Sequence, residues 1–314
     1  MDLVPIDDIR AAAADIAPTV LRTPLLRTRW DDGLWLKPEN LQPVGSFKLR
    51  GAIHAIARLD PARRERGVVT HSSGNHGQAL AYAARAAGIS CTVVVPEGAP
   101  EVKIAQIRAL GATVLLVPPA RRLAEAQRVA AETGAELVPP FDDRRIIAGQ
   151  GTIGLEILDD LPGVEVVLVP VGGGGLSSGV ATAVKALRLS TAVIGVEPLL
   201  AADARDSLAA GRLVGWDVAL TYRTCADGLR AGLSELTLAH LRERLDGIVT
   251  VTEEEIRAAV GRLARDARLV VEPSGAVAAA ARLFRPDELP AGRTVAVLTG
   301  GNVDPALLAD LVTA

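Results

Sequence analysis

Short runs of β-branched residues alternate with helical segments along most of this chain. Strand-like runs occupy residues 68–71, 91–95 and 113–117, and the segments between them carry apolar residues at helical spacing. A second alternating set begins near residue 146 and continues to a last strand-like run at 294–298. Parallel strands need long crossover connections, which are usually helices. The alternation therefore predicts an α/β fold with twisted, mostly parallel sheets flanked by helices.

The length of the chain favours two domains over one. A single core rarely extends over 314 residues, and 49% hydrophobic residues with only 3% aromatics supply aliphatic side chains for two interiors. The two alternating sets meet near residues 139–143. We therefore expect a small mobile domain at residues 67–144 and a large domain formed by residues 1–66 and 145–314.

Charge and hydropathy argue against several classes of partner. The net charge of −3 gives no electrostatic reason to expect nucleic acid or an anionic membrane. No stretch reaches the roughly 18 uncharged apolar residues that span a bilayer. The first residues are acidic and interrupted by a proline, so they do not form a signal-peptide pattern. Cys91 and Cys225 lie too far apart in the sequence to match the paired spacing of zinc or redox motifs. We expect a soluble, cytoplasmic protein.

Lys48 is a candidate for chemistry because this chain uses arginine almost everywhere else. The 34 basic residues include only four lysines, which are Lys37, Lys48, Lys103 and Lys185. Arginine stays protonated, whereas a lysine can lose its proton on burial and form a Schiff base with an aldehyde. Lys48 also follows a Gly-Ser-Phe turn at residues 45–47. The alternative is an ordinary surface lysine on a helix.

Three polar turns that contain glycine follow predicted strands, at residues 72–75, 172–175 and 299–302. Ligands of parallel α/β sheets bind at the carboxyl ends of the strands, where these turns lie. The four glycines at 172–175 precede a predicted helix, so backbone amides and the helix N-terminus can hold a phosphate. The alternative is a tight turn that needs positive φ, although four consecutive glycines exceed that need.

A dinucleotide site is a rival interpretation of the same glycines. Glu197 lies 25 residues after Gly172, at the end of the next predicted strand, which mimics a dinucleotide fingerprint. The third glycine of that fingerprint is absent, because Ser177 and Ser178 occupy the candidate positions. A nicotinamide cofactor would also leave Lys48 without a role.

The turn Ser72-Ser73-Gly74-Asn75-His76 opens a predicted helix, where free amides and the Ser73 hydroxyl suit a carboxylate. The alternative is ordinary N-capping by serine or asparagine. Together with Lys48, the phosphate turn and the strand-end hydroxyl of Thr299, this turn completes the set of groups needed to hold pyridoxal phosphate and an amino acid.

The sequence resembles the fold-type II pyridoxal-phosphate enzymes, and within them the threonine/serine dehydratase and serine racemase group. The resemblance rests on PENLQPVGSFKLRGA (38–52), HSSGNHGQA (71–79), AGQGT (148–152), VPVGGGGL (169–176), ADGL (226–229), EPSGA (272–276) and TGGN (299–302). These segments occur in the family's order and span nearly the whole chain. The resemblance implies a fold like that of the tryptophan synthase β subunit.

The resemblance also implies roles for matching residues. The cofactor would be held by Phe47, Lys48, Asn75, Gly172, Gly173, Gly174, Gly175, Leu176 and Thr299. The substrate carboxylate would be held by Ser72, Ser73, Gly74, Asn75 and His76. Lys48 would carry the cofactor as a Schiff base and then act as the base at the substrate Cα. Ser73 matches the serine that protonates the opposite face of Cα in racemases, but dehydratases of the group carry it too.

A divalent-cation site is implied by the same resemblance. Glu197, Asp203 and the backbone carbonyl of Ala201 match the cation loop of serine racemases and some dehydratases. Oxygen ligands of this kind suit Mg²⁺, Mn²⁺ or Ca²⁺. The alternative is a solvated acidic loop.

We therefore expect a pyridoxal-phosphate-dependent lyase that dehydrates L-threonine or L-serine to a 2-oxo acid and ammonia. The enzyme would act on a small hydroxy amino acid, and the resemblance implies a homodimer. Serine racemisation, 3-hydroxyaspartate dehydration and a non-catalytic ligand-binding relative remain open as alternatives.

Overall fold

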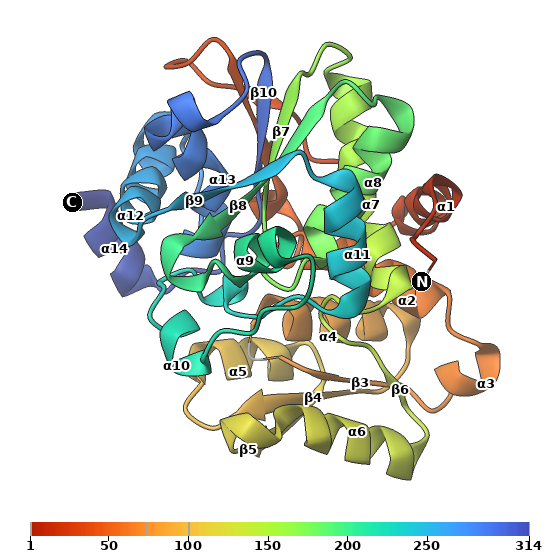
Figure 1. The fold of residues 1–314 in the computed structure, drawn as a ribbon. Coiled ribbons are helices and arrows are strands. Elements are labelled where there is room, and N and C mark those ends of the chain that lie inside the picture. The colour runs from red at the N-terminus through yellow and green to blue at the C-terminus, as the bar shows by residue number, and fades with distance from the viewer. Residues whose placement is uncertain (1, 73, 100, 314) are drawn as a thin grey trace.

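The computed structural model describes residues 2–72, 74–99 and 101–313, and it contains two β-sheets covered by helices (Figure 1). The strands are β1 (Leu26–Arg27), β2 (Leu34–Pro38), β3 (Val68–His71), β4 (Cys91–Pro96), β5 (Thr113–Val117), β6 (Glu136–Leu137), β7 (Val166–Pro170), β8 (Ala192–Pro198), β9 (Gly247–Val251) and β10 (Thr294–Leu298). The α-helices are α1 (Ile6–Ile16), α2 (Lys48–Ala57), α3 (Pro61–Arg64), α4 (Asn75–Ala87), α5 (Glu101–Ala109), α6 (Arg122–Thr133), α7 (Arg144–Asp160), α8 (Gly175–Leu187), α9 (Asp203–Ala210), α10 (Val218–Thr221), α11 (Glu235–Arg244), α12 (Glu253–Arg262), α13 (Pro273–Phe284) and α14 (Pro305–Thr313). Short 3-10 helices are η1 (Glu39–Leu41), η2 (Pro119–Arg121), η3 (Leu199–Ala201), η4 (Asp227–Leu229) and η6 (Pro286–Glu288), and η5 (Leu263–Ala267) is a short π-helix.

The larger sheet has six strands in the order β1-β2-β10-β7-β8-β9. All neighbouring pairs are parallel except β1 with β2, which is antiparallel. Every residue of β7 and β10 is buried. Such continuous apolar runs are typical of parallel strands that are covered on both faces.

Alternate residues of the central strand β10 enter opposite cores. Val295 and Val297 pack with α7 and α8, whereas Ala296 and Leu298 pack with α12 and α13. This follows from the two-residue period of a strand, in which successive side chains point to opposite faces. Figure 1 shows the two helix pairs on opposite sides of the larger sheet.

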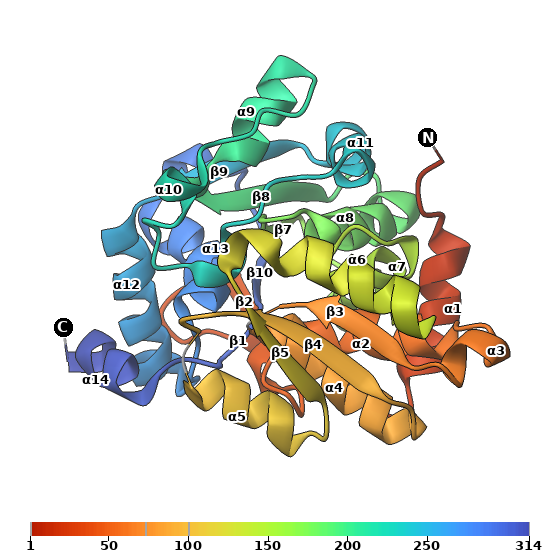
Figure 2. The same ribbon diagram turned by 90° about the horizontal axis from the view of Figure 1, so that it is seen from below.

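The smaller sheet is fully parallel and has the order β5-β4-β3-β6. Val68 and Val93 pack with α4 and α5 on one face, and Val69 and Val94 pack with α6 on the other. Figure 2 shows α6 and α5 on either side of these strands. Helix α2 packs against both α4 and α7, so it joins the layers of the two sheets.

The predicted α/β fold with mostly parallel sheets is confirmed. Helix α12 begins with a capping box, since Thr252 N donates to the Glu255 carboxylate at 2.8 Å and Glu255 N donates to the Thr252 hydroxyl at 3.3 Å. Within the described ranges, no helix is both long and apolar enough to cross a bilayer.

Candidate active site

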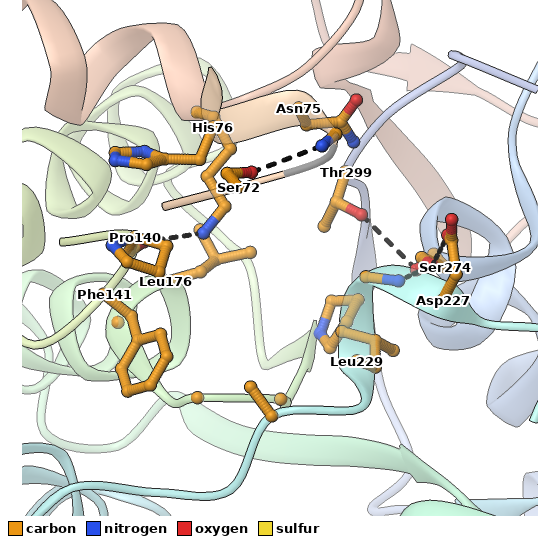
Figure 3. Close-up of a pocket in the computed structure, with 18 of the residues that line it drawn as sticks. Ser72, Asn75, His76, Pro140, Phe141, Leu176, Asp227, Leu229, Ser274 and Thr299 are labelled. Atoms are coloured by element: carbon orange, nitrogen blue, oxygen red, sulfur yellow. Dashed lines mark hydrogen bonds between the residues drawn. The ribbon is translucent and has the colours of Figure 1, made fainter. Parts of the chain in front are cut away.

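Turns at the carboxyl ends of strands from both sheets surround one cavity of about 260 Å³. Its lining includes Lys48, Ser72, the glycines at 172–175 and Thr299, which the sequence analysis selected from separate motifs. Figure 3 shows Asn75 and Thr299 across the cavity from Pro140 and Phe141. The structure therefore brings together residues that lie more than 200 positions apart in the chain.

Backbone pairing places Lys48 beside the end of β10. The backbone N–H of Phe47 donates to the carbonyl of Thr299 at 3.1 Å, and that of Gly301 donates to the carbonyl of Gly45 at 2.9 Å. Lys48 is the first residue of α2, directly after this pairing. The Gly-Ser-Phe turn is thus the part that fixes the lysine against the larger sheet.

The Lys48 amine lies in an environment that favours its neutral form. Its Nζ donates to the Pro140 carbonyl at 2.7 Å and lies 5.1 Å from the centre of the Phe47 ring. Burial lowers the pKa of Lys48 to about 8. The partial positive charge at the N-terminus of α2 acts in the same direction. A neutral amine is the form that attacks an aldehyde or accepts a proton.

The glycines at 172–175 form a turn between β7 and α8 whose backbone N–H groups face no acceptor among the described residues. Gly174 has φ +85°, which favours glycine, and it is the residue before the first turn of α8. Free amides at a helix N-terminus are suited to a phosphate, so these residues fit the phosphate group that the resemblance implies.

Phe141 covers the glycine turn, and the sequence analysis did not assign it a role. A Cβ added to Gly173 would lie 2.4 Å from the Phe141 ring, and one added to Gly175 would lie 2.9 Å from the Phe141 Cβ. Phe141 and Pro140 belong to the segment that links β6 to α7. Its apolar sequence carried no signal of a site, because its partners are distant in the chain.

The turn after β3 leads into α4 and presents backbone to the cavity. Ser72 N donates to the Val94 carbonyl at 3.1 Å, which fixes the start of the turn. A Cβ added to Gly74 would have no atom within 4 Å, so this side of the turn is open. Ser73, expected to act in catalysis and in substrate binding, lies outside the described residues.

His76 is buried and neutral. Its Nε2 lies 3.1 Å from the Val138 carbonyl, which makes Nε2–H the donor and leaves Nδ1 as an acceptor. Burial, together with the charge of Lys48, lowers the pKa of His76 to about 3. Its ring is therefore unsuited to attract a carboxylate by charge, and its backbone N–H at the start of α4 is the group available for that task.

Asn75 is held by two side chains that the sequence analysis left without a role. Its Nδ2 donates to Glu272 Oε1 at 2.6 Å, and its Oδ1 accepts from Asn302 Nδ2 at 2.7 Å. Burial, with the nearby negative charge of Asp227, raises the pKa of Glu272 to about 7. Nδ2 has two N–H groups, so one remains for a cofactor atom. Both residues could have been selected from the sequence, because Glu272 and Asn302 lie in motifs that carry the family resemblance.

Thr299 ends β10 with its hydroxyl at the cavity. Its Oγ1 donates to the carbonyl of Ser274 at 3.3 Å and retains lone pairs as an acceptor. Figure 3 shows this hydroxyl between the Asn75 side and the Ser274–Asp227 side of the cavity.

The expected cation loop lies outside the lining of this cavity, at the end of β8. Glu197 accepts hydrogen bonds from Ala204 N at 3.0 Å and Arg205 N at 2.8 Å. Burial, with the nearby Asp203, raises the pKa of Glu197 to about 8, and burial also raises the pKa of Asp203. No group of three or more His, Cys, Asp or Glu side chains in the described residues is placed to hold a metal. Glu197 and Asp203 are both buried, and they remain the two acidic side chains of this loop that could hold a cation.

Comparison with known proteins assigns the chain to a family. The family model described as "Pyridoxal-phosphate dependent enzyme" matches residues 16–300. The chain belongs to this family. It is therefore a pyridoxal-phosphate-dependent enzyme, and the similar proteins place it among the lyases and racemases of the fold-type II group.

Three similar proteins represent the group. The L-threonine ammonia-lyase of Thermotoga maritima is 43% identical, covering 96% of this chain and 76% of the relative. The beta-hydroxyaspartate dehydratase of Paracoccus denitrificans is 39% identical, covering 95% and 96%. The solved structure of maize serine racemase is 37% identical, with a TM-score of 0.93 and coverage of 98% and 97%. This pyridoxal-phosphate enzyme is similar to all three throughout nearly its full length.

Proposed function

We propose that this pyridoxal-phosphate enzyme is an ammonia-lyase that converts L-threonine or L-serine into a 2-oxo acid and ammonia by β-elimination. The observation that carries the proposal is that the amine of Lys48 shares a cavity with the glycines at 172–175, whose four backbone N–H groups donate to no described residue and so suit a phosphate. Two of the similar proteins are named for removing ammonia or water from hydroxy amino acids, threonine and β-hydroxyaspartate.

Lys48 has two tasks in this proposal. Its amine holds the cofactor, and after release it accepts the proton from the substrate Cα. The bound cofactor supplies a ring that withdraws electrons from that carbon. Because burial lowers the pKa of Lys48 to about 8, a useful fraction of the amine is neutral near neutral pH and ready to accept the proton.

The other residues hold the two anions and the ring. The glycines at 172–175 would bind the phosphate, and Phe47 and Leu176, which line the same cavity, would pack beside the ring. The turn from Ser72 to His76 binds the substrate carboxylate through backbone N–H groups. Asn75 would donate to a ring oxygen of the cofactor, and the Thr299 hydroxyl would face its ring nitrogen. A hydroxyl at that position does not keep the nitrogen protonated as a carboxylate does, which favours elimination.

The net reaction is balanced without a further reactant. Loss of the Cα proton is followed by cleavage of the Cβ–O bond, and the hydroxyl leaves with a proton as water. Water then replaces the nitrogen, so the products are one 2-oxo acid and one ammonia.

We also propose a divalent cation, Mg²⁺, Mn²⁺ or Ca²⁺, at Glu197, Asp203 and the Ala201 carbonyl. The support is that both carboxylates are buried side by side in one loop and that burial raises the pKa of each, because a bound cation would stabilise their charged forms. Treatment with a chelator should lower the melting temperature, and adding back the cation should restore it. An unchanged melting temperature would reject the cation.

Residues 67–144 are proposed to move as a small domain over the substrate. The ion pair between Lys103 in α5 and Asp227 in η4, with 2.8 Å between Nζ and Oδ2, spans the cavity between the two sheets and supports closure at this point. A homodimer is proposed as well. Light scattering of the purified protein tests it, and the mass of a single chain would argue against it.

Serine racemisation is a second candidate function. The observation that favours it is the likeness to maize serine racemase, with a TM-score of 0.93. Both reactions begin with loss of the Cα proton, and they differ in whether the β-hydroxyl leaves or a proton returns from the Ser73 side.

A panel of L- and D-β-hydroxy amino acids tests the proposal. The purified enzyme should form 2-oxo acid from L-threonine or L-serine faster than it forms the D-enantiomer. Accumulation of D-serine faster than pyruvate would overturn the choice in favour of racemisation. Absence of both products with every substrate would reject both functions.

A further inference from the structure

Glu272 is a buried carboxylate at the cavity that has no cationic partner. Its side chain lines the cavity, and the residue is only 4% exposed. In the part of the chain that the structure describes, no lysine, arginine or histidine lies within salt-bridge distance of it, because the nearby Lys103 pairs with Asp227 instead. Burial of a carboxylate without a cation is unfavourable unless hydrogen bonds compensate for it. The position of Glu272 is therefore explained by the groups that donate to it.

The donor to this carboxylate is the side chain of Asn75, whose Nδ2 lies 2.6 Å from Glu272 Oε1. The backbone brings Glu272 to this place, since its N–H donates to the Gly300 carbonyl at 3.0 Å. A Cβ added to Gly300 would lie 2.4 Å from Glu272 Oε1 and 3.2 Å from Asn75 Nδ2. A glycine directly after Thr299 therefore leaves the space in which the carboxylate and the amide meet.

The orientation of the Asn75 amide is fixed from both ends. The Val44 carbonyl can only accept, so the Asn302 atom 2.9 Å from it is the donor Nδ2. The same Nδ2 lies 2.7 Å from Asn75 Oδ1, which therefore faces Asn302. The Asn75 Nδ2 group then faces Glu272, with one N–H used in this bond and the second left for the cavity.

Asn75 needs such an anchor because of its place in the fold. Among the proposed cofactor contacts, it alone belongs to residues 67–144, and the others belong to the part that contains the larger sheet. Glu272 directly precedes α13 and Asn302 follows β10, so both lie on that larger part. Figure 3 shows Asn75 on the same side of the cavity as Thr299. Glu272 and Asn302 thus hold the amide of Asn75 to the part of the chain that carries the remaining contacts.

The hydrogen bond from Asn75 is compatible with both protonation states of Glu272. Burial, with the negative charge of Asp227, raises the pKa of Glu272 to about 7, while the bond from Asn75 and the charge of Lys103 act in the opposite direction. Both forms are therefore populated near neutral pH. A carboxylate and a neutral carboxylic acid each keep an oxygen that accepts. A glutamine, which is neutral and has the same shape, keeps such an oxygen too.

We infer that Glu272 is a positioning residue for the cofactor, which accepts one N–H of Asn75 and thereby directs the other toward the ring oxygen of pyridoxal phosphate. The inference rests on the proposed function, because that function includes the contact between Asn75 and the cofactor. Glu272 acts through Asn75 and through its oxygen rather than its charge. Its effect on the cofactor should therefore disappear when Asn75 is removed.

Equilibrium binding of pyridoxal phosphate to the full chain, without substrate, tests this role. Asn75→Ala should weaken cofactor binding about tenfold, which corresponds to one hydrogen bond. Glu272→Ala should weaken it by nearly the same factor, and the double variant should bind no more weakly than Asn75→Ala, because both changes remove one contact. Glu272→Gln should lose less than about threefold, since its amide oxygen accepts from Asn75. Losses that multiply in the double variant, or a loss in Glu272→Gln equal to that in Glu272→Ala, would overturn the inference.

The visible absorbance of the bound cofactor separates positioning from a general structural defect. At saturating cofactor, Asn75→Ala and Glu272→Ala should shift this absorbance in the same direction, because both remove a donor from the ring oxygen. Asp31→Ala is the control. Asp31 accepts from Gly33 N and Arg282 Nε, each at 2.8 Å, and does not line the cavity. Asp31→Ala should lower the melting temperature and leave the absorbance and the cofactor affinity unchanged. An unshifted absorbance in Glu272→Ala, or an equal shift in Asp31→Ala, would overturn the inference.

These measurements do not depend on the reaction. The expected cofactor results in a protein that forms no 2-oxo acid from any substrate would support the inference and reject only the proposed elimination. Wild-type cofactor affinity in Asn75→Ala would overturn the inference together with the contact of Asn75, whereas release of 2-oxo acid by the same wild-type preparation would still support the elimination.

Discussion

Lys48 differs from the other lysines of this chain in its partners. Lys37, Lys103 and Lys185 each have a carboxylate within 2.8 Å of Nζ. In the described residues, Lys48 has no such partner and donates to the Pro140 carbonyl. A carboxylate would favour the charged ammonium, whereas a buried site without one favours the neutral amine. Both the burial of Lys48 and the lack of a carboxylate partner among the described residues therefore favour the neutral amine that the proposed role requires.

The pH dependence of cofactor attachment tests this environment. The pKa of Lys48 is lowered from 10.5 to about 8, so the neutral amine becomes the main form above about pH 8. Covalent attachment of pyridoxal phosphate to the cofactor-free protein should therefore accelerate with pH and level off above about pH 8. Rapid-mixing absorbance measures the rate, with N-α-acetyl-lysine as the control. A protein rate that still climbs through pH 10, as the control should, would contradict the lowered pKa.

Single residues of the site were predictable from the sequence where a motif carried them. Lys48, Ser72, the glycines at 172–175 and Thr299 do line one cavity. Phe141 was not predictable, because its contact with the glycine turn joins segments distant in the chain. No local pattern encodes such a contact.

At the scale of elements, the turn between β7 and α8 depends on the lack of side chains. Gly173→Ala places a Cβ about 2.4 Å from the Phe141 ring, so the ring or the turn must move. We expect cofactor affinity to fall about tenfold or more, since displaced amides no longer converge on the phosphate. Equilibrium titration with pyridoxal phosphate measures the loss.

Gly215→Ala is the matched control for this substitution. A Cβ at Gly215 would have no atom within 4 Å, and the residue does not line the cavity. Its cofactor affinity should equal that of the wild type. If Gly173→Ala also binds with wild-type affinity, the glycine turn is not the phosphate site.

Helix α2, which begins with Lys48, is anchored by a buried ion network. Arg50 is fully buried and pairs with Glu39 at 2.7 Å and with Glu156 at 2.6 Å. Arg50→Met leaves the buried carboxylate of Glu39 and the partly buried one of Glu156 without this partner, and removal of one member of such a network costs about 3–5 kcal/mol of unfolding free energy. Urea unfolding measures the loss. The exposed pair of Arg10 with Asp7 serves as the control, and Arg10→Met should cost less than about 1 kcal/mol. Equal small losses would show that the network does not anchor α2.

The predicted elements were most accurate where the hydrophobic signal was continuous. The runs at 113–117 and 294–298 are strands with the same bounds, β5 and β10. The strands β1, β2, β6 and β9 were not predicted. β2 contains Lys37 and ends at Pro38, which weakens its strand pattern, and its pairing with β10 joins residues at opposite ends of the chain.

At the scale of the whole molecule, the alternation of strands and helices predicted the architecture but not the strand order. The parallel pairing of β7 with β8, and of β3 with β4 in the smaller sheet, follows from the local alternation of strand and helix. The insertion of β10 between β2 and β7 does not, because it depends on pairings across the chain. That insertion places Thr299 beside Lys48, so it creates the site that the separate motifs only implied.

The central claim is that Lys48 and the cofactor together eliminate water from a β-hydroxy amino acid. The most direct measurement is the release of 2-oxo acid and ammonia by the purified holoenzyme and by Lys48→Ala, supplied with L-threonine, L-serine and 3-hydroxyaspartate in turn. We expect the wild type to release both products in equal amounts from at least one substrate, at a rate about 10³-fold above the variant. No release from any substrate, or an undiminished rate in Lys48→Ala, would contradict the claim.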